Sequence, residues 1–248
     1  PWSAETFRRF LSEHVTALPK GAWPTIVLSN HDQPRHIDRY GHGGDAKARA
    51  RIAALLLLTM PGTPFLYYGE ELGMRNGRLR YRDLQDPYTK RFWPFRTGRD
   101  PARTPMQWDG SRHAGFSNER PWLPVSPDYP QLNVAQLTSN PQSLWSLYRQ
   151  LLYHRRISPA LNRGDCRLVS GGPGECLLYE RVASLENGAH ERILVAVNFS
   201  ERTVAITMPD GSSSGQVLLS TDAQKRGLVW DLRRVQLGPQ EGVVVRLL

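Results

Sequence analysis

Cysteine is scarce in this sequence of 248 residues, since only Cys166 and Cys176 occur. Two thiols exclude both a disulfide framework and a zinc site built from four thiolates. Long apolar runs are also missing, because the longest, residues 52–60, is far shorter than the roughly 20 residues that a membrane-spanning helix needs. The hydrophobic fraction of 40% and the charged fraction of 22% exclude disorder, collagen and coiled coil. We therefore expect a globular chain without a membrane span.

Acidic residues are outnumbered by basic ones, 23 to 32, which gives a formal net charge of +9. Such an excess is one feature of nucleic-acid-binding proteins. Here the arginines are scattered along the chain, and no block of like charges forms a tail or an arm, so we predict no nucleic-acid partner. The sequence starts with the pattern of an amphipathic helix, residues 6–15, rather than with a basic segment followed by an apolar one. The scarcity of cysteine fits a reducing compartment, and we expect a cytoplasmic protein.

The first part of the sequence alternates helical and strand-like segments. Residues 6–15 have apolar side chains at helical spacing, and residues 45–60 form an Ala- and Leu-rich helical segment that a Pro-Gly pair ends. Residues 25–28 and 63–68 are short apolar runs, typical of strands that are buried on both faces. The order helix, strand, helix, strand predicts parallel βα units.

A connection of unusual length follows, over residues 75–141, before helical spacing returns in residues 144–157. Connections this long are normally functional or disordered. Aromatic side chains within it favour an ordered, packed loop. These aromatic residues are Trp93, Phe95, Trp108, Phe116 and Trp122. The basic residues between Arg75 and Arg99, mixed with Tyr81, Tyr88, Phe92 and Trp93, could also form a stacking surface for single-stranded nucleic acid. We expect instead that the arginines pair with Asp83, Asp86 and Asp100 at the rim of a cleft.

Short β-rich runs separated by turn residues make up the end of the sequence. They cover residues 176–181, 193–199, 203–208, 217–220 and 242–247. Several short strands at near-regular spacing predict an antiparallel sheet or sandwich. We place the domain boundary near residues 161–165, with an α/β part in residues 1–161 and an antiparallel β domain in residues 162–248.

Polar side chains follow both of the predicted parallel strands. Residues 29–32 (Ser-Asn-His-Asp) come after the first strand and residues 69–71 (Gly-Glu-Glu) after the second. In parallel βα architectures the carboxyl ends of the strands converge on one crevice, where reacting groups lie. The alternative is structural: Asp32 would make an Asx-turn, and Glu70 would cap the turn that follows it.

Several motifs resemble those of the α-amylase family of glycoside hydrolases. Residues 30–35 (Asn-His-Asp-Gln-Pro-Arg) resemble the family's last conserved region, and residues 39–41 and 60–74 resemble its passage into the eighth barrel strand. The segments that narrow the resemblance to the oligo-1,6-glucosidase and α-glucosidase branch are residues 103–109, 114–117 and 121–125. The β-rich remainder is similar to the family's C-terminal domain.

This resemblance implies the C-terminal part of a (β/α)8 TIM barrel, its last two strands and helices, followed by an antiparallel β-sandwich domain. It also implies a retaining α-glucosidase that hydrolyses short oligosaccharides from the non-reducing end, through an oxocarbenium-like transition state. Asp32 stands at the position of a family carboxylate that stabilises the transition state. His31 would donate to the same sugar ring, and Arg103 matches an arginine that holds the non-reducing-end glucose.

The sequence departs from the family pattern at the two reacting carboxylates. In the family, the nucleophilic Asp and the general acid Glu lie upstream of the Asn-His-Asp motif, and only residues 1–29 precede that motif here. Glu70 and Glu71 are no substitutes, because the family carries this pair in addition to its acid. We therefore expect the chain alone to be inactive. Its expected partners are an oligosaccharide, the remainder of the barrel, and other chains joined in an oligomer through unpaired strand edges.

Other sites have less support in the sequence. Residues of metal-binding type are His31, His36, His42, Asp32, Asp38 and Asp45. Their spacing matches no helix face and no metal motif, so we expect neither a metal nor another cofactor. Cys166 and Cys176 either face each other across a hairpin or, as we expect, pack as small hydrophobic side chains.

The function classes that stay open are an enzyme and a non-catalytic carbohydrate-binding module that uses the end of the fold. Asp32 and Arg103 favour the enzyme, because their family roles belong to an active cleft. Within the family, trehalose synthase and sucrose isomerase or hydrolase are alternatives to α-glucosidase. The preference for one glycosidic linkage depends on loops outside this chain.

Overall fold

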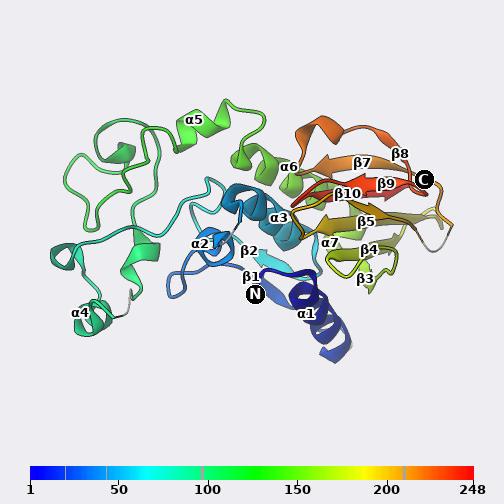
Figure 1. Cartoon of the computed structure of the whole chain (residues 1–248), viewed down its shortest axis with the longest axis horizontal. Helices are drawn as coiled ribbons and strands as arrows, with labels where there is room; N and C mark the ends of the chain where they lie inside the picture. The colour runs from blue at the N-terminus through cyan, green and yellow to red at the C-terminus, as the bar shows by residue number, and fades with distance from the viewer. Residues whose placement is uncertain (20, 43, 96–97, 209–210) are drawn as a thin grey trace. The chain divides into compact units, whose positions relative to one another are not determined.

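The computed structural model describes residues 1–19, 21–42, 44–95, 98–208 and 211–248, with the backbone alone for residues 14–17 (Figure 1). The chain divides into two compact units. The sheet unit comprises residues 1–26, 51–64 and 149–248, and the loop unit comprises residues 27–50 and 65–148.

The structure confirms the N-terminal helix that the spacing of apolar residues predicted. Helix α1 spans Ala4–Ala17, and the Ser3 hydroxyl accepts a hydrogen bond from the Thr6 backbone N–H at 3.2 Å. A serine at this position satisfies one of the free N–H groups at a helix start. Phe7 and Leu11, four residues apart, lie on the buried face of the helix.

Strands β1 (Thr25–Val27) and β2 (Thr63–Phe65) form a two-stranded sheet. The prediction of strands buried on both faces is wrong here. In β1 only Ile26 is buried, whereas the side chains of Val27 and Phe65 are 49% and 54% exposed. Within the described residues these strands pair only with each other.

Helix α3 spans Ala46–Thr59, as its sequence predicts. The Asp45 carboxylate begins it by accepting hydrogen bonds from two backbone N–H groups of the first turn. Residues 52–58 are fully buried. In the sheet unit, the Thr59 hydroxyl is hydrogen-bonded to the Tyr179 hydroxyl, and the Arg51 guanidinium donates to the Thr221 carbonyl at 3.0 Å. The second half of this helix therefore depends on strands far away in the sequence.

Two buried arginines bind the carbonyl groups at the end of α3. Arg155, in helix α6 (Leu144–Ile157), donates to the carbonyls of Leu58, Met60 and Gly62. Arg181 donates to the carbonyls of Thr59 and Gly164. Burial lowers the pKa of the Arg155 guanidinium to about 10, with the positive charge of Arg181 as a second cause. These side chains take the place of the donors that the helix end lacks.

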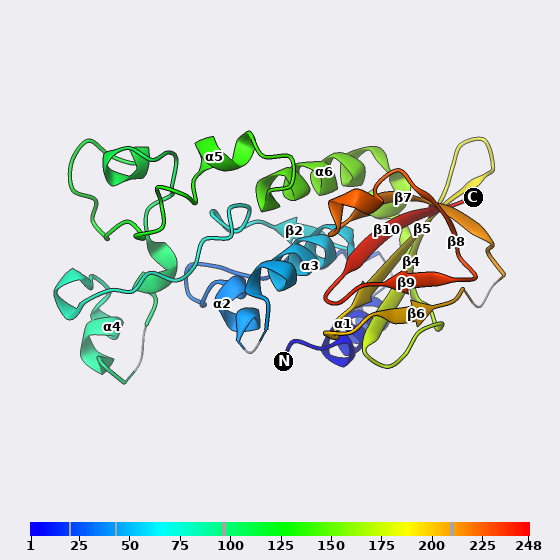
Figure 2. The same ribbon diagram turned by 45° about the horizontal axis from the view of Figure 1, so that its top comes forward.

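The β-rich part contains two antiparallel sheets (Figure 2). The larger sheet has the order β3-β4-β5-β10-β7-β8, and the smaller pairs β6 with β9. Their bounds are Asp165–Leu168 (β3), Cys176–Ser184 (β4), His190–Asn198 (β5), Val204–Ile206 (β6), Ser214–Ser220 (β7), Val229–Asp231 (β8), Val235–Leu237 (β9) and Gly242–Leu247 (β10). Both sheets contribute to one apolar core, which includes Leu178, Val204, Leu237 and Val245. The short helix α7 (Pro159–Arg163) precedes β3.

The two cysteines do not face each other. In the register of β3 and β4, Cys166 lies opposite Arg181, so the hairpin pairing is wrong. Both thiols are free, and Cys176 is part of the apolar core, as expected for a small hydrophobic side chain. Burial raises the pKa of both thiols to about 11.

The loop unit holds short helices joined by irregular segments. They are α2 (His36–Gly41), α4 (Pro87–Phe92), α5 (Val134–Thr138) and the 3-10 turns Tyr81–Asp83, Asp100–Arg103 and Arg112–Gly115. The long loop is ordered around the buried side chains of Leu72, Met74 and Met106. The aromatic residues that we expected to pack it are largely exposed, Phe95 and Trp122 most of all, so packing by those rings is wrong. Residues 96–97 lie outside the described residues.

No helix in the described part of the chain is long and apolar enough to cross a membrane.

Candidate functional site

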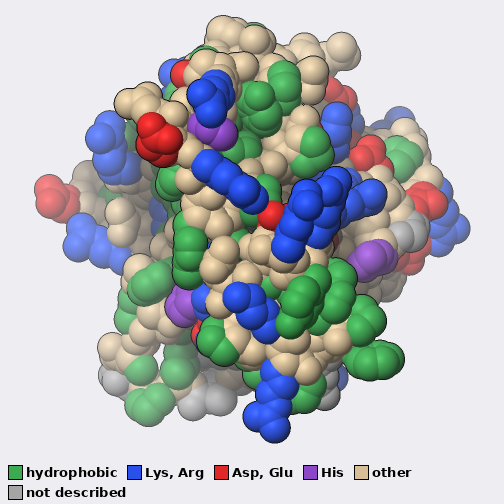
Figure 3. All heavy atoms as spheres, turned by 90° about the vertical axis from the view of Figure 1, so that its left-hand side faces the viewer, with side chains coloured by type: hydrophobic (Ala, Val, Ile, Leu, Met, Phe, Trp, Pro, Cys, Tyr) green, Lys and Arg blue, Asp and Glu red, His purple; other side chains and the backbone are tan. Residues whose placement is uncertain are grey.

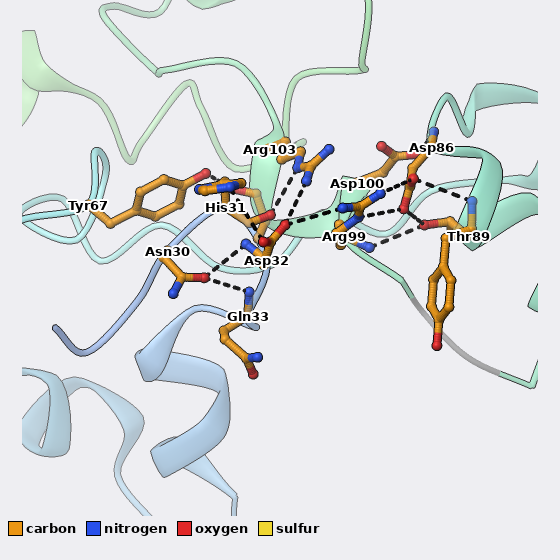
Figure 4. Close-up of polar contacts among 12 residues, drawn as sticks. Asn30, His31, Asp32, Gln33, Tyr67, Asp86, Thr89, Arg99, Asp100 and Arg103 are labelled. Carbon is orange, nitrogen blue, oxygen red and sulfur yellow. Dashed lines mark hydrogen bonds and ion pairs between the residues drawn. The ribbon is translucent and has the colours of Figure 1, made fainter.

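The segment after β1 presents the side chain of Asp32 (Figure 4). The Asn30 side-chain oxygen accepts hydrogen bonds from the backbone N–H groups of Asp32 and Gln33, each at 2.9 Å. Asn30, not Asp32, therefore makes the Asx-turn, and this corrects the structural alternative for Asp32. The Asp32 carboxylate is left to contact other side chains, and it is 48% exposed.

The three residues predicted for the site lie together. The Arg103 Nη2 atom is 2.9 Å from Asp32 Oδ1, and Arg103 Nε donates to the His31 carbonyl at 2.9 Å. The His31 Nε2 atom lies 3.5 Å from Asp32 Oδ2. Arg103 comes from a 3-10 turn some 70 residues further along the chain, so its two hydrogen bonds join that turn to the segment after β1.

A second guanidinium, that of Arg99, reaches the same carboxylate. Its Nη1 atom lies 3.5 Å from Asp32 Oδ1. The other side of this guanidinium binds Asp86, with Nε at 3.0 Å from Oδ2 and Nη2 at 2.7 Å from Oδ1. These hydrogen bonds hold the pKa of the Asp86 carboxyl well below its usual range. In the sequence, Arg99 was not distinguished from the other arginines of the long loop. Its position four residues before Arg103 was the signal available.

The loop unit also holds a buried polar cluster of Ser29, His36 and Glu70. The Ser29 hydroxyl accepts from the His36 backbone N–H at 2.9 Å and is 3.1 Å from His36 Nδ1. The Glu70 side chain is also buried, with Oε1 at 3.5 Å from His36 Nδ1. Glu70 therefore neither caps a turn through its carboxylate nor lies exposed beside Asp32. Burial raises the pKa of the neighbouring Glu71 carboxyl.

Arg35 supports the strand end from within the loop unit. Its guanidinium lies 5.1 Å and 4.8 Å from the ring centres of Tyr67 and Tyr68, and it donates to the Tyr68 carbonyl at 2.6 Å. Cation–π contacts of this kind stabilise the charge of a buried arginine. Burial raises the pKa of the Tyr68 hydroxyl above its usual value.

Two of the possible metal ligands, Asp38 and Asp45, have other partners. The Asp38 carboxylate accepts from Arg75 and from the Asn76 backbone N–H, and Asp45 begins α3. Over the described residues, no group of three or more His, Cys, Asp or Glu side chains is placed to hold a metal ion.

Lys and Arg side chains are prominent on the face that Figure 3 shows. The expected pairing with acids holds for Asp86 with Arg99, and Asp83 pairs with Arg120 at 3.2 Å. Asp100 is different, because its Oδ2 atom accepts hydrogen bonds from the backbone N–H groups of Gln85 and Asp86. Among the residues that the structure describes, no arginine pairs with it.

Chemically, the site offers a half-exposed carboxylate held by two guanidinium groups. Such a group accepts hydrogen bonds from hydroxyls and stabilises positive charge that develops beside it. It does not by itself provide the nucleophile and acid pair of a retaining glycosidase.

Residues 1–164 match the profile of the family described as "Alpha amylase, catalytic domain". The chain belongs to the α-amylase family, and its relatives place it in the glucosidase branch, which confirms the resemblance seen in the motifs. The family fold, a TIM barrel with a β domain, is also that of its structural neighbours.

Several proteins of this branch are similar to the chain. The oligo-1,6-glucosidase of Parageobacillus thermoglucosidasius is 32% identical over 269 residues, which cover 100% of this chain and 46% of that protein. A probable alpha-glucosidase of Rhizobium meliloti (strain 1021) is 37% identical over 200 residues, 80% of this chain and 35% of that protein. The crystal structure of the trehalulose synthase MutB from Pseudomonas mesoacidophila MX-45 superposes with a TM-score of 0.84 at 29% identity, covering 100% of this chain and 47% of MutB. The chain thus spans about half the length of the relatives it matches.

Proposed function

We propose that this chain is part of a retaining α-glucosidase that hydrolyses α-glucosidic bonds of short oligosaccharides from the non-reducing end. The observation that carries the proposal is the Asp32 carboxylate, half-exposed and held by Arg103 and Arg99. The names of the relatives support it, since several are oligo-1,6-glucosidases.

In this proposal the chain supplies the groups that bind and stabilise. Asp32 accepts hydrogen bonds from sugar hydroxyls, and these strengthen as positive charge develops on the sugar ring in the transition state. His31 and Arg103 bind the same sugar. The nucleophile and the general acid come from outside this chain, so residues 1–248 alone are inactive.

We further propose how the chain maps onto the family fold. Residues 1–161, with the loop of residues 75–141, form the last two strands and helices of the barrel. Residues 162–248 form the C-terminal β-sandwich. The family profile, which ends at residue 164, and the shared core of the two sheets support this division. The exposed Val27 and Phe65 side chains fit strands whose neighbours come from the remainder of the barrel or from a second copy. The proposed location is cytoplasmic.

A second candidate is an enzyme that rearranges sucrose, because trehalulose synthase structures superpose on the whole chain. The two candidates differ in product. With sucrose as substrate, a hydrolase releases glucose and fructose, whereas an isomerase yields another disaccharide.

The test uses the active enzyme that contains this chain, with Asp32→Asn as the variant and Asp231→Asn as the matched control. Asp231 is an exposed carboxylate of the β domain, paired with Arg233. We expect turnover of p-nitrophenyl α-glucoside to fall by about 100-fold or more for Asp32→Asn and to stay unchanged for Asp231→Asn. Undiminished turnover by Asp32→Asn, or sugar binding without any turnover by the unaltered enzyme, would contradict the proposal.

A further inference from the structure

Asp86, which binds Arg99, has no role in the proposal above. The side chain of Asp86 is 1% exposed, unlike the exposed carboxylates of most surface ion pairs. It precedes α4, where its carboxylate accepts from the Tyr88 backbone N–H at 3.4 Å and from the Thr89 hydroxyl at 2.9 Å. A buried carboxylate is costly unless it is fully paired, so its partners are closely constrained.

The Arg99 residue is held at both ends. Its backbone N–H donates to the Thr89 hydroxyl at 3.1 Å, and its guanidinium forms the two-point contact with Asp86 (Figure 4). The next residue, Asp100, is buried and accepts from the backbone N–H groups of Gln85 and Asp86 at 2.7 and 2.8 Å. Residues 85–89 and 99–100 are therefore joined by hydrogen bonds on both sides of the pair.

This arrangement fixes the plane of the Arg99 guanidinium. Two of its nitrogen atoms are engaged with Asp86, and a two-point contact with a carboxylate is possible in one plane only. The third nitrogen, Nη1, then points to Asp32 Oδ1, the oxygen that Arg103 also contacts. Asp32 therefore contacts two guanidinium groups. That of Arg99 is held by the buried Asp86 carboxylate, and that of Arg103 is held by the His31 carbonyl.

We propose that Asp86 is a positioning residue, which acts through Arg99 to set the orientation of the Asp32 carboxylate. The inference rests on the proposed function for its effect on turnover, but the orientation of Asp32 is measurable without turnover. The competing role for Asp86 is helix capping alone.

The variant Asp86→Asn separates the two roles. Asparagine caps helices as well as aspartate does, so α4 keeps its cap. The asparagine amide has one acceptor oxygen and one donor NH2 group. It therefore cannot accept hydrogen bonds from two nitrogen atoms of Arg99 in the two-point geometry, and the guanidinium is released. Asp83→Asn is the matched control, since Asp83 pairs with Arg120 in the same loop and neither residue contacts Asp32 in the described structure.

The first measurement is nuclear magnetic resonance on the full chain. In Asp86→Asn we expect exchange of the Arg99 Nε proton to accelerate about tenfold and the side-chain torsion of Asp32, read from three-bond couplings, to become averaged. Asp83→Asn should change neither. An Asp32 torsion that stays fixed while Arg99 is released would overturn the proposal, as would Arg99 exchange that is already fast in the unaltered chain.

The second measurement is steady-state kinetics on the active enzyme. We expect Asp86→Asn to lower kcat by about tenfold while KM changes less than about twofold, because the orientation of Asp32 matters in the transition state. If Asp86→Asn does not fold, Arg99→Lys serves instead, because one ammonium cannot span two carboxylates. An unchanged kcat, or an equal loss in Asp83→Asn, would overturn the positioning role in catalysis. Absence of turnover in the unaltered enzyme refutes the proposed function alone, and the couplings then decide the positioning.

Discussion

Replacement of Arg103 by alanine should weaken catalysis by the enzyme that contains this chain. The change removes two hydrogen bonds, one to the Asp32 carboxylate and one to the His31 carbonyl. A hydrogen bond to a charged group contributes about 1.5–3 kcal/mol, and each 1.4 kcal/mol is a factor of about ten. The side chains of Arg103 and Asp32 are 25% and 48% exposed, so solvent screening puts the expected effect near the lower end.

We therefore expect kcat/KM for maltose and isomaltose to fall by about tenfold in Arg103→Ala. The loss should appear in both kcat and KM, because Arg103 orients Asp32 and binds the sugar. Arg103→Lys should recover only part of it, since one ammonium cannot serve both acceptors. The matched control is Arg233→Ala, which removes an exposed guanidinium from the β domain. Unchanged kinetics for Arg103→Ala, or an equal loss for Arg233→Ala, would refute this reasoning.

Two further predictions concern the β domain. The pKa of Cys166 and Cys176 rises from 9.0 to about 11, so folding favours the protonated thiols. The sign follows: their contribution to the free energy of unfolding is complete below about pH 9 and is lost as the pH rises toward 11. Urea unfolding from pH 8 to 11 checks this, and a double Ala variant should show a flatter profile; an identical slope would contradict the argument. The side chain of Glu180 is buried and paired with Arg167 and Arg192. We expect the substitution Glu180→Gln to lower the free energy of unfolding by about 1–3 kcal/mol. Equal urea midpoints would show that desolvation cancels the pair.

Local patterns predicted much of the secondary structure. Helical spacing gave the positions of α1, α3 and α6 because each pattern records contacts within a few residues. Strands β3, β8 and β9 escaped notice, since they are three or four residues long and carry little periodicity. The burial of β1 and β2 was overestimated because burial depends on neighbours that no residue of a strand encodes by itself.

The site was predictable to the extent that its residues belong to motifs. Asp32, His31 and Arg103 lie together as the resemblance implied. The contribution of Asp86 and Arg99 was not predictable, because the pair joins two segments of a loop without a repeating pattern. The Asx-turn at Asn30 was assigned to the wrong residue, since Asn and Asp both favour such turns and only the fold distinguishes them.

The long-range contacts of α3 have a consequence for synthesis of the chain. The hydrogen bond between the hydroxyls of Thr59 and Tyr179 cannot form until the ribosome has made Tyr179, which follows Thr59 by 120 residues. At about 5–20 residues per second, the ribosome needs on the order of 10 s to make that stretch. During this time residues 52–58, which are fully buried in the folded chain, lie in a helix that lacks its hydrogen bonds to Tyr179 and Thr221. Apolar surface exposed in this way during synthesis promotes aggregation, which chaperones counter. A truncation near residue 164 would make the delay permanent, so expression tests of shortened chains should retain the β domain.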